Sequence, residues 1–456
     1  MRGDGEVSPN ELSLAQAALE IREGRLSATE LAAACLEAIA ARDADLGAFA
    51  FVDRDHVLRQ AEAADDRRQQ GKPVGALHGV PIAIKDIFDT ADMPTEFGSP
   101  IHAGRRPRRD AACVASLRAA GAVILGKTVT TEFAYFHPGR TSNPHDPQRT
   151  PGGSSSGSAA AVAASMAPGA IGSQTNGSVI RPASFCGVVG FKPTHGLIPR
   201  SGALQLSRAL DHVGVFARTV EDAAMLAQAM AGHHDGDPDT RALASPRFLE
   251  VAREKPPLPP RLAFARTCVW DRAETDVRQG FALLVERLGE RIEEVDMDQA
   301  TSAIHELHAT VMQVEMAHNL RPEYERARDR LSGKILEQIE AGRARLALDY
   351  RRALDLAAPL GESIGAVLDE FDAIVTPAAA GEAPPGLEAT GDPAFCTIWT
   401  YFGMPAITLP LLHGANGLPI GVQLVGRRGD DARLLRTARW LAQQLSARPA
   451  KREKKR

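Results

Sequence analysis

The segment 150–200 limits the fold more than any other part of this sequence. It is rich in Gly and Ser, yet it surrounds the apolar, Ala-rich run SAAAVAASMA (158–167). The small side chains of that run predict a core helix that packs closely against its neighbours, and a disordered Gly/Ser linker would contain no such helix. We therefore expect residues 150–200 to be ordered and to form part of a buried core.

Sequence on both sides of this segment alternates between strand and helix patterns. The β-branched run GVPIAIKD (79–86) predicts a strand that ends at Lys85, and AVIL (122–125) predicts a second buried strand after helical sequence over 110–121. Further helices are expected over 220–230 and 431–445, and a strand at FDAIVTP (371–377). This alternation is typical of an α/β fold with a mixed sheet flanked by helices.

The predicted organisation is one large domain, residues 1–456. Residues 1–75 are expected to be N-terminal helices, since Ser13 with Gln16 and Ser27 with Glu30 have capping-box spacing and Gly24 is placed to end the first helix. Residues 76–235 would form the core, and the charged helical sequence 301–365 a cover over the pocket mouth. The basic end, 448–456, is expected to be a disordered tail.

Composition excludes several classes of function. The 53 Lys+Arg residues are balanced by 57 Asp+Glu, so the chain lacks the positive field of a nucleic-acid-binding protein. No window approaches the roughly 18 apolar residues of a membrane span, and the first residues do not resemble a secretory signal. The five cysteines are scattered without a CxxC pair. We expect a cytoplasmic protein with reduced thiols that acts on a small molecule.

Three motifs carry the chemistry: IKD around Lys85, PGGSSSGSAA (151–160) and GSQTNGSVIRPASFCGVVGFKPT (172–194). Together they resemble the amidase signature family, and the resemblance extends to FDAIVTP and to GLPIGVQLVG (417–426). It implies a triad of Ser178 as nucleophile, Ser154 as a bridging serine in a cis peptide and Lys85 as the final proton acceptor. The resemblance also implies an oxyanion hole made by the backbone N–H groups of Thr175, Asn176, Gly177 and Ser178. No cofactor or metal is implied.

These residue types suit hydrolysis of an amide-type C–N bond. A serine hydroxyl is a poor nucleophile until a neighbouring base takes its proton. A lysine with a pKa near 10.4 is neutral in roughly one molecule in 2,500 at pH 7, so the site must lower the pKa by about three units. Lys85, at the end of a buried strand, is placed for that shift.

The nucleophile turn departs from the common family sequence GTDTGGSIR. Gln174 replaces Asp, Asn176 replaces Gly, and the arginine is displaced by one position. The turn resembles a malonamidase-type branch, in which an arginine three positions after the nucleophile, here Arg181, is associated with binding a substrate carboxylate. A scaffold salt bridge is the alternative role for Arg181. The tentative substrate-binding set is Arg181, Gln174, Phe133, Tyr135 and Trp399, although the three aromatic residues suit the core equally well.

Other functions remain as alternatives. Carbamate or aryl ester hydrolysis would use the same triad, and an inactive scaffold protein would keep the fold without the chemistry. Residues 121–128 match the phosphate-loop pattern G-x-x-x-x-G-K-[ST], but the four intervening residues are themselves an apolar strand. Cys186 is a rival nucleophile whose apolar neighbours indicate a packing role. The partner we expect is a small amide or carbamate, with no nucleic acid and no membrane, and a homodimer is the assembly to test.

Overall fold

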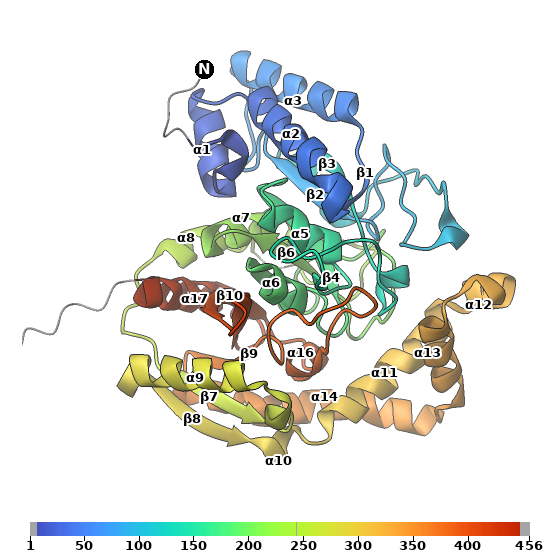
Figure 1. Cartoon of the computed structure of the whole chain (residues 1–456), viewed down its shortest axis with the longest axis vertical. Helices are drawn as coiled ribbons and strands as arrows, with labels where there is room; N and C mark the ends of the chain where they lie inside the picture. Colours follow the sequence, from blue (N-terminus) through green and yellow to red (C-terminus); the bar gives the residue numbers. More distant parts are fainter. Residues whose placement is uncertain (1–6, 243, 447–456) are drawn as a thin grey trace, which may run out of the picture.

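The computed structural model describes residues 7–242 and 244–446, and its centre is an eleven-stranded sheet within those residues (Figure 1). The strand order is β1-β3-β2-β4-β6-β5-β10-β11-β9-β7-β8. The strands are β1 (Phe49–Phe51), β2 (Pro81–Lys85), β3 (Val123–Thr128), β4 (Gly169–Gln174), β5 (Val189–Lys192), β6 (His212–Ala217), β7 (Leu262–Thr267), β8 (Ile292–Met297), β9 (Ala373–Pro377), β10 (Ala406–His413) and β11 (Pro419–Val425).

The sheet is mixed, as the alternating sequence pattern predicts. β2 runs parallel to both β3 and β4, and β7 runs parallel to β8 and β9, whereas the other pairs are antiparallel. Every residue of β2 is buried, because the strand has a neighbour on each side and helices over the sheet. Lys85, the last residue of β2, is therefore held in the interior.

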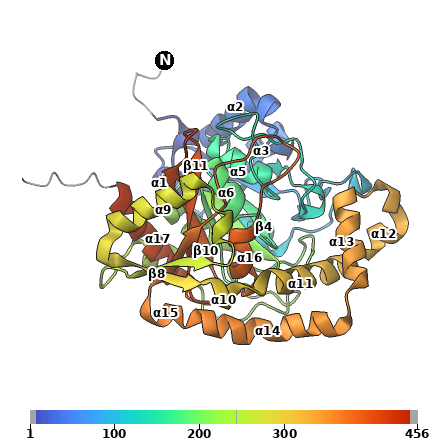
Figure 2. The ribbon, with the colours of Figure 1, turned by 60° about the horizontal axis from the view of Figure 1, so that its bottom comes forward.

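Helices flank the sheet. They are α1 (Leu14–Glu23), α2 (Ala28–Leu46), α3 (Arg54–Gln69), α4 (Ala112–Ala119), α5 (Ser156–Ala163), α6 (Ile180–Cys186), α7 (Val220–Met230), α8 (Phe248–Arg253), α9 (Thr275–Leu288), α10 (Asp298–Thr301), α11 (Ile304–Asn319), α12 (Arg321–Ala327), α13 (Gly333–Ala344), α14 (Ala347–Gly365), α15 (Val367–Glu370), α16 (Ala394–Tyr401) and α17 (Asp431–Ser446). Figure 2 shows α11, α13 and α14 grouped along one side of the molecule, and α11 packs against α13, α14 and α16.

Most element boundaries agree with the sequence prediction. Both capping boxes form, and Gly24 ends α1 in a left-handed conformation with φ 75°. The predicted core helix at 158–167 is shifted: α5 begins at Ser156 and ends at Ala163. Ser165 has a φ of 54°, so the chain turns there and no helix continues to residue 167. The predicted tail at 448–456 lies outside the described residues.

Residues 301–365 are mostly helical, in agreement with their charged pattern. Within residues 7–242 and 244–446, no helix combines the length and the low polarity that crossing a bilayer requires.

Candidate active site

Two serine-bearing turns meet at the N-terminal ends of adjacent helices. Ser154 lies two residues before α5, and Ser178 lies two residues before α6. The Gly153–Ser154 peptide bond is cis, as the family resemblance implies. Both serines line one small cavity of about 10 Å³, which is about the space that one water molecule needs.

Lys85 joins this site from the end of β2. Its Nζ donates hydrogen bonds to Ser154 Oγ at 2.7 Å and to Ser173 Oγ at 2.9 Å, and its side chain is fully buried. Burial lowers the pKa of Lys85 well below its ordinary value, and the negative charge of Asp211 opposes this shift in part. A buried lysine with a lowered pKa can accept a proton from a serine near neutral pH.

The turn between Thr175 and Ser178 presents backbone donors at the nucleophile. Within the described chain, the N–H groups of Asn176, Gly177 and Ser178 find no hydrogen-bond acceptor. Thr175, Asn176 and Ser178 also line the small cavity. Donors in this arrangement can stabilise the negative oxygen of a tetrahedral intermediate.

Helix α16 holds this turn in place. Gln174 Oε1 accepts hydrogen bonds from the N–H groups of Val179 and Ile180, and its Nε2 donates to Thr400 Oγ1 at 2.9 Å. The Thr400 hydroxyl donates to the carbonyl of Asn176, and the Thr397 hydroxyl donates to Asn176 Oδ1, both at 2.6 Å. Two threonines of α16 therefore support the asparagine that stands in the place of the family's glycine.

Thr175 is fixed by two buried titratable residues. Its hydroxyl donates to Asp211 Oδ1 at 2.6 Å, and its carbonyl oxygen accepts from His308 Nε2 at 2.9 Å. Burial raises the pKa of Asp211 to about 6, although its hydrogen bond from Thr175 lowers it. Burial lowers the pKa of His308 to about 4, so this imidazole is neutral near pH 7 and its Nε2 carries the proton.

Arg181 is almost completely buried, at 1% exposure, and lines the same small cavity as Ser178. Its Nη2 donates to the carbonyl of Gly153 at 2.7 Å and to Thr390 Oγ1 at 3.2 Å, whereas Nε and Nη1 have no partner among the described residues. No described carboxylate lies within 4 Å of the guanidinium, which argues against the scaffold salt bridge. Burial lowers the pKa of Arg181 to about 10.

The other predicted substrate-binding residues are divided. Tyr135 lines the small cavity, but Phe133, Gln174 and Trp399 do not, and all three are fully buried. For Gln174 and Trp399 the direction of the side chain explains this placement. Gln174 points away from Ser173 because neighbours in a strand face opposite sides, and on α16 Trp399 lies off the face that carries Thr397 and Thr400. These three residues belong to the packed interior of the site.

Sequence reasoning missed Ser173, Thr131, Asp211 and His308. Ser173 was accessible to it, because it lies one position before Gln174 in β4 and so faces the opposite side of the sheet, where Lys85 lies. Thr131 lines the small cavity, and its Oγ1 has no partner among the described residues. Asp211 and His308 come from distant segments with no motif of their own.

Neither competing site has suitable geometry. Lys127 is buried beside Asp86, 3.2 Å from its Oδ1, and donates to the carbonyls of Phe88 and Pro94, so it has no free face for a phosphate. Cys186 is also buried; burial raises the pKa of its thiol, which contacts the carbonyl of Pro151. All five cysteines are free thiols, as predicted. Among the described residues, no three His, Cys, Asp or Glu side chains are grouped as metal ligands.

Comparison with known proteins agrees with the motifs. The Amidase family model matches residues 30–435. Among curated proteins, the amidotransferase component named for glutamyl-tRNA(Gln) in Chloroflexus aurantiacus is 34% identical, with 93% of this chain and 94% of that protein covered. The corresponding protein of Anaeromyxobacter dehalogenans is also 34% identical, over 96% of this chain and 97% of that protein. Both are named as one subunit of the glutamyl-tRNA(Gln) amidotransferase.

Solved structures show the same fold. The peptide amidase of Stenotrophomonas maltophilia is 30% identical with a TM-score of 0.82, covering 96% of this chain and 98% of that one. A protein from a vestigial complex connected with the origins of an s-triazine catabolic enzyme is 28% identical with a TM-score of 0.88, covering 95% and 98%. A 6-aminohexanoate cyclic dimer hydrolase is 27% identical with a TM-score of 0.85, covering 97% and 98%. The chain is therefore a member of the amidase signature family, folded as a single amidase domain.

Proposed function

We propose that this protein hydrolyses an amide-type C–N bond of a small molecule through an acyl-enzyme formed on Ser178. The observation that carries the proposal is the 2.7 Å hydrogen bond between Lys85 Nζ and Ser154 Oγ, in a buried site whose cavity Ser154 shares with Ser178. The geometry provides a base, a bridging hydroxyl and a nucleophile in sequence. The similar proteins named as a peptide amidase and a cyclic dimer hydrolase support a hydrolase reaction.

In the proposed reaction, neutral Lys85 takes a proton through Ser154 while Ser178 Oγ attacks the carbonyl carbon. The N–H groups of the turn from Thr175 to Ser178 donate to the developing oxyanion; loss of one such donor in other enzymes costs about 2.7–4 kcal/mol. Lys85 then returns the proton through Ser154 to the departing nitrogen. Water hydrolyses the acyl-enzyme by the same relay in the second half of the reaction. Carbamates and aryl esters pass through similar intermediates and remain alternatives.

Trapping the acyl group tests this proposal. Mass spectrometry of protein quenched after brief exposure to a panel of amides, carbamates and aryl esters should show one acyl adduct, on the peptide that contains Ser178. Ser178→Ala and Lys85→Ala should remain folded and lose both adduct and turnover, whereas Cys186→Ala should retain them. Turnover at the wild-type rate by Ser178→Ala would refute the mechanism and would also return the inactive scaffold to consideration.

Arg181 supports a finer proposal, that the acyl half of the substrate carries a carboxylate, as in the malonamidase-type branch. A buried guanidinium with two unpartnered N–H groups is costly unless a ligand pairs with it. Arginine matches a carboxylate with two parallel hydrogen bonds, and Nη1 and Nε are the groups available for this. The adjacent orphan hydroxyl of Thr131 adds a further donor in the same cavity.

The test compares an acidic amide with a neutral one. Hydrogen bonds to charged groups contribute about 1.5–3 kcal/mol each, so Arg181→Met should lower kcat/KM for malonamate by roughly 10- to 150-fold or more. Propionamide, which has a methyl group in place of the carboxylate, should lose less than threefold. Equal losses for the two amides would show that Arg181 only supports the scaffold.

The assembly is a separate proposal. The curated relatives are named as one subunit of an amidotransferase, and one similar structure comes from a protein complex, so association with another chain occurs among proteins of this fold. We propose a homodimer in the absence of a partner chain. The molar mass in solution, measured by light scattering on the purified chain, decides between one copy and two.

A further inference from the structure

A second and much larger cavity adjoins the small one that contains Ser178. It has a volume of about 410 Å³, within the range of about 300–1,000 Å³ that is usual for ligand pockets. Ala134, Thr175 and Leu206 line both cavities, so the two meet at the nucleophile turn. Because the small cavity holds about 10 Å³, a substrate larger than its acyl group must extend into the large one.

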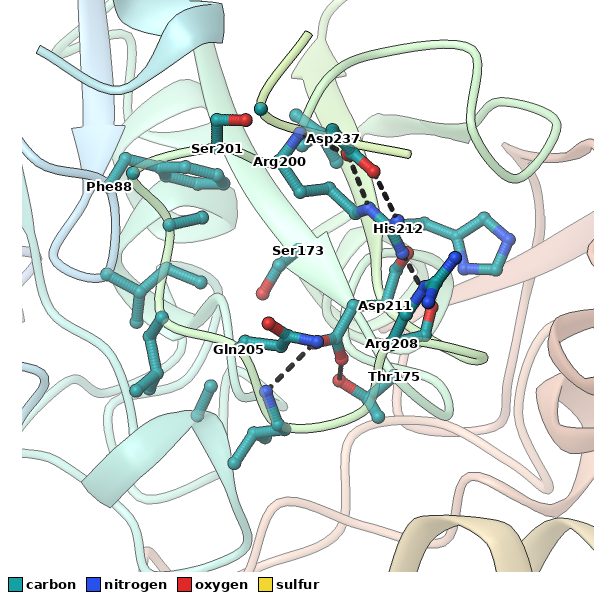
Figure 3. Close-up of a pocket in the computed structure, with 18 of the residues that line it drawn as sticks. Phe88, Ser173, Thr175, Arg200, Ser201, Gln205, Arg208, Asp211, His212 and Asp237 are labelled. Carbon is teal, nitrogen blue, oxygen red and sulfur yellow. Dashed lines mark hydrogen bonds and ion pairs between the residues drawn. The ribbon is translucent and has the colours of Figure 1, made fainter. Parts of the chain in front are cut away.

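The proton relay indicates which half of the substrate lies on this side. Ser173 Oγ accepts a hydrogen bond from Lys85, and its side chain lines the large cavity, into which Figure 3 shows its hydroxyl pointing. The departing nitrogen must approach Ser154, which receives the other hydrogen bond of Lys85. Arg181 lines the small cavity and not the large one. The large cavity therefore begins on the side from which the amine leaves.

The charged groups in the wall of the large cavity are already paired with one another. Arg200 contacts Asp237 at 2.7 Å, and the exposed Arg208 contacts Asp239 at 3.0 Å. Asp211 accepts hydrogen bonds from Thr175, and from the backbone N–H groups of Leu206 and Ser207 (Figure 3). None of these groups is left to neutralise a charged ligand.

The remaining wall is largely apolar. It includes Phe88, Ile87, Leu204, Leu206 and Val213, and the Phe88 ring lies on the wall in Figure 3. Apolar walls with a few polar groups favour an uncharged ligand that buries hydrocarbon or an aromatic ring. The lining thus selects against a cationic amine and provides more space than ammonia would need.

We propose that this large cavity binds the leaving-group half of the substrate, an uncharged amine substituent with an apolar chain or ring. The inference rests on the proposed function and extends it to a substrate class, N-substituted amides. The bond from Ser178 Oγ to the carbonyl carbon forms as the C–N bond breaks. The proton of Ser178 passes through Ser154 to Lys85, and Lys85 returns one proton to the nitrogen, which leaves as the neutral amine into the large cavity.

The experiment varies only the amine. Malonamate, N-benzylmalonamate and N-(2-aminoethyl)malonamate share one acyl group, so they form the same acyl-enzyme and differ in the acylation step alone. For the wild type, kcat/KM should be at least tenfold higher for the benzyl amide than for the other two. Equal values for the three amides, with Ser178 acylated by each, would overturn the inference and leave the proposed function intact.

Filling the cavity provides the matched test. Ala203 lines the large cavity, so Ala203→Phe should remove the benzyl preference while kcat/KM for malonamate stays within about threefold. Ala209 lies on the same loop outside this cavity, and Ala209→Phe should keep the preference. Gln205→Trp repeats the test at an exposed position of the lining, where a folding defect is not expected.

A change in acyl preference would give the opposite answer. If Ala203→Phe altered the ratio of N-benzylmalonamate to N-benzylacetamide hydrolysis and left the amine preference unchanged, the cavity would hold the acyl half, and the inference would be wrong. Absence of any acyl group on Ser178 with all of these amides would instead count against the proposed function itself.

Discussion

Asp211 makes an unusual prediction: its replacement by Asn should stabilise the protein near neutral pH. The carboxyl group is buried, and burial raises its pKa from 3.8 to about 6. Because the folded pKa lies above the unfolded one, the folded state holds the proton more tightly, and stability is lost as the pH rises from about 4 to about 6. A shift of about two units corresponds to roughly 3 kcal/mol at pH 7.

Asparagine can keep the hydrogen bonds of Asp211 without its charge. One carboxylate oxygen accepts both backbone N–H groups, of Leu206 and Ser207, and the amide oxygen of Asn can do the same. The amide NH₂ would then face Thr175, whose hydroxyl can accept as well as donate. The variant should therefore gain most of the roughly 3 kcal/mol that the buried charge costs.

Thermal unfolding of Asp211→Asn and the wild type at pH 7 and pH 4.5 measures this effect. The variant should unfold at a higher temperature at pH 7, and its advantage should shrink as the pH falls toward 4. Asp237→Asn is the control with the opposite sign, because Arg200 holds the pKa of Asp237 below its usual value, so stability is lost as the pH falls. An Asp211→Asn midpoint at or below that of the wild type at pH 7 would refute the reasoning.

Three further predictions concern catalysis. Since Lys85 must be neutral to act as the base, kcat/KM should fall at low pH; loss of the Asp211 charge lowers the pKa of Lys85 further, so this acid limb should lie at lower pH in Asp211→Asn, and an unmoved limb would contradict it. Thr400→Val removes two hydrogen bonds that support the oxyanion turn, worth about 0.5–1.5 kcal/mol each, and should lower kcat roughly 5- to 150-fold with little change in KM. His308→Gln can still donate to the Thr175 carbonyl and should retain more kcat than His308→Leu, whereas equal kcat values would exclude that hydrogen bond from catalysis.

Local sequence predicted the parts of the site that depend on local structure. Lys85 was placed at the end of a buried strand because a β-branched run ends there, and β2 has that boundary. The two serine turns were placed at helix ends because an Ala-rich helix separates them, and α5 lies between them. Hydrophobic pattern and capping chemistry are properties of neighbouring residues, so sequence shows them directly.

Side-chain direction was harder to predict. Gln174 and Trp399 lie close in sequence to residues that touch the site, yet their own side chains face the interior. In β4 the alternation of faces separates Ser173 from Gln174, and on α16 the helical repeat separates Trp399 from Thr397 and Thr400. A shift of one residue reverses the direction, so proximity to a motif did not identify the lining residues.

Contacts between distant segments could not be predicted at all, and α11 provides the main example. His308 binds the carbonyl of Thr175, Glu315 accepts from the Ser207 hydroxyl, and Asn319 donates to the carbonyl of Leu206. One helix of the segment expected to cover the pocket therefore holds both the oxyanion turn and the loop that lines the large cavity. Changes in α11 that reshape the cavity would also move Thr175, so substrate preference and catalytic rate should vary together in this protein.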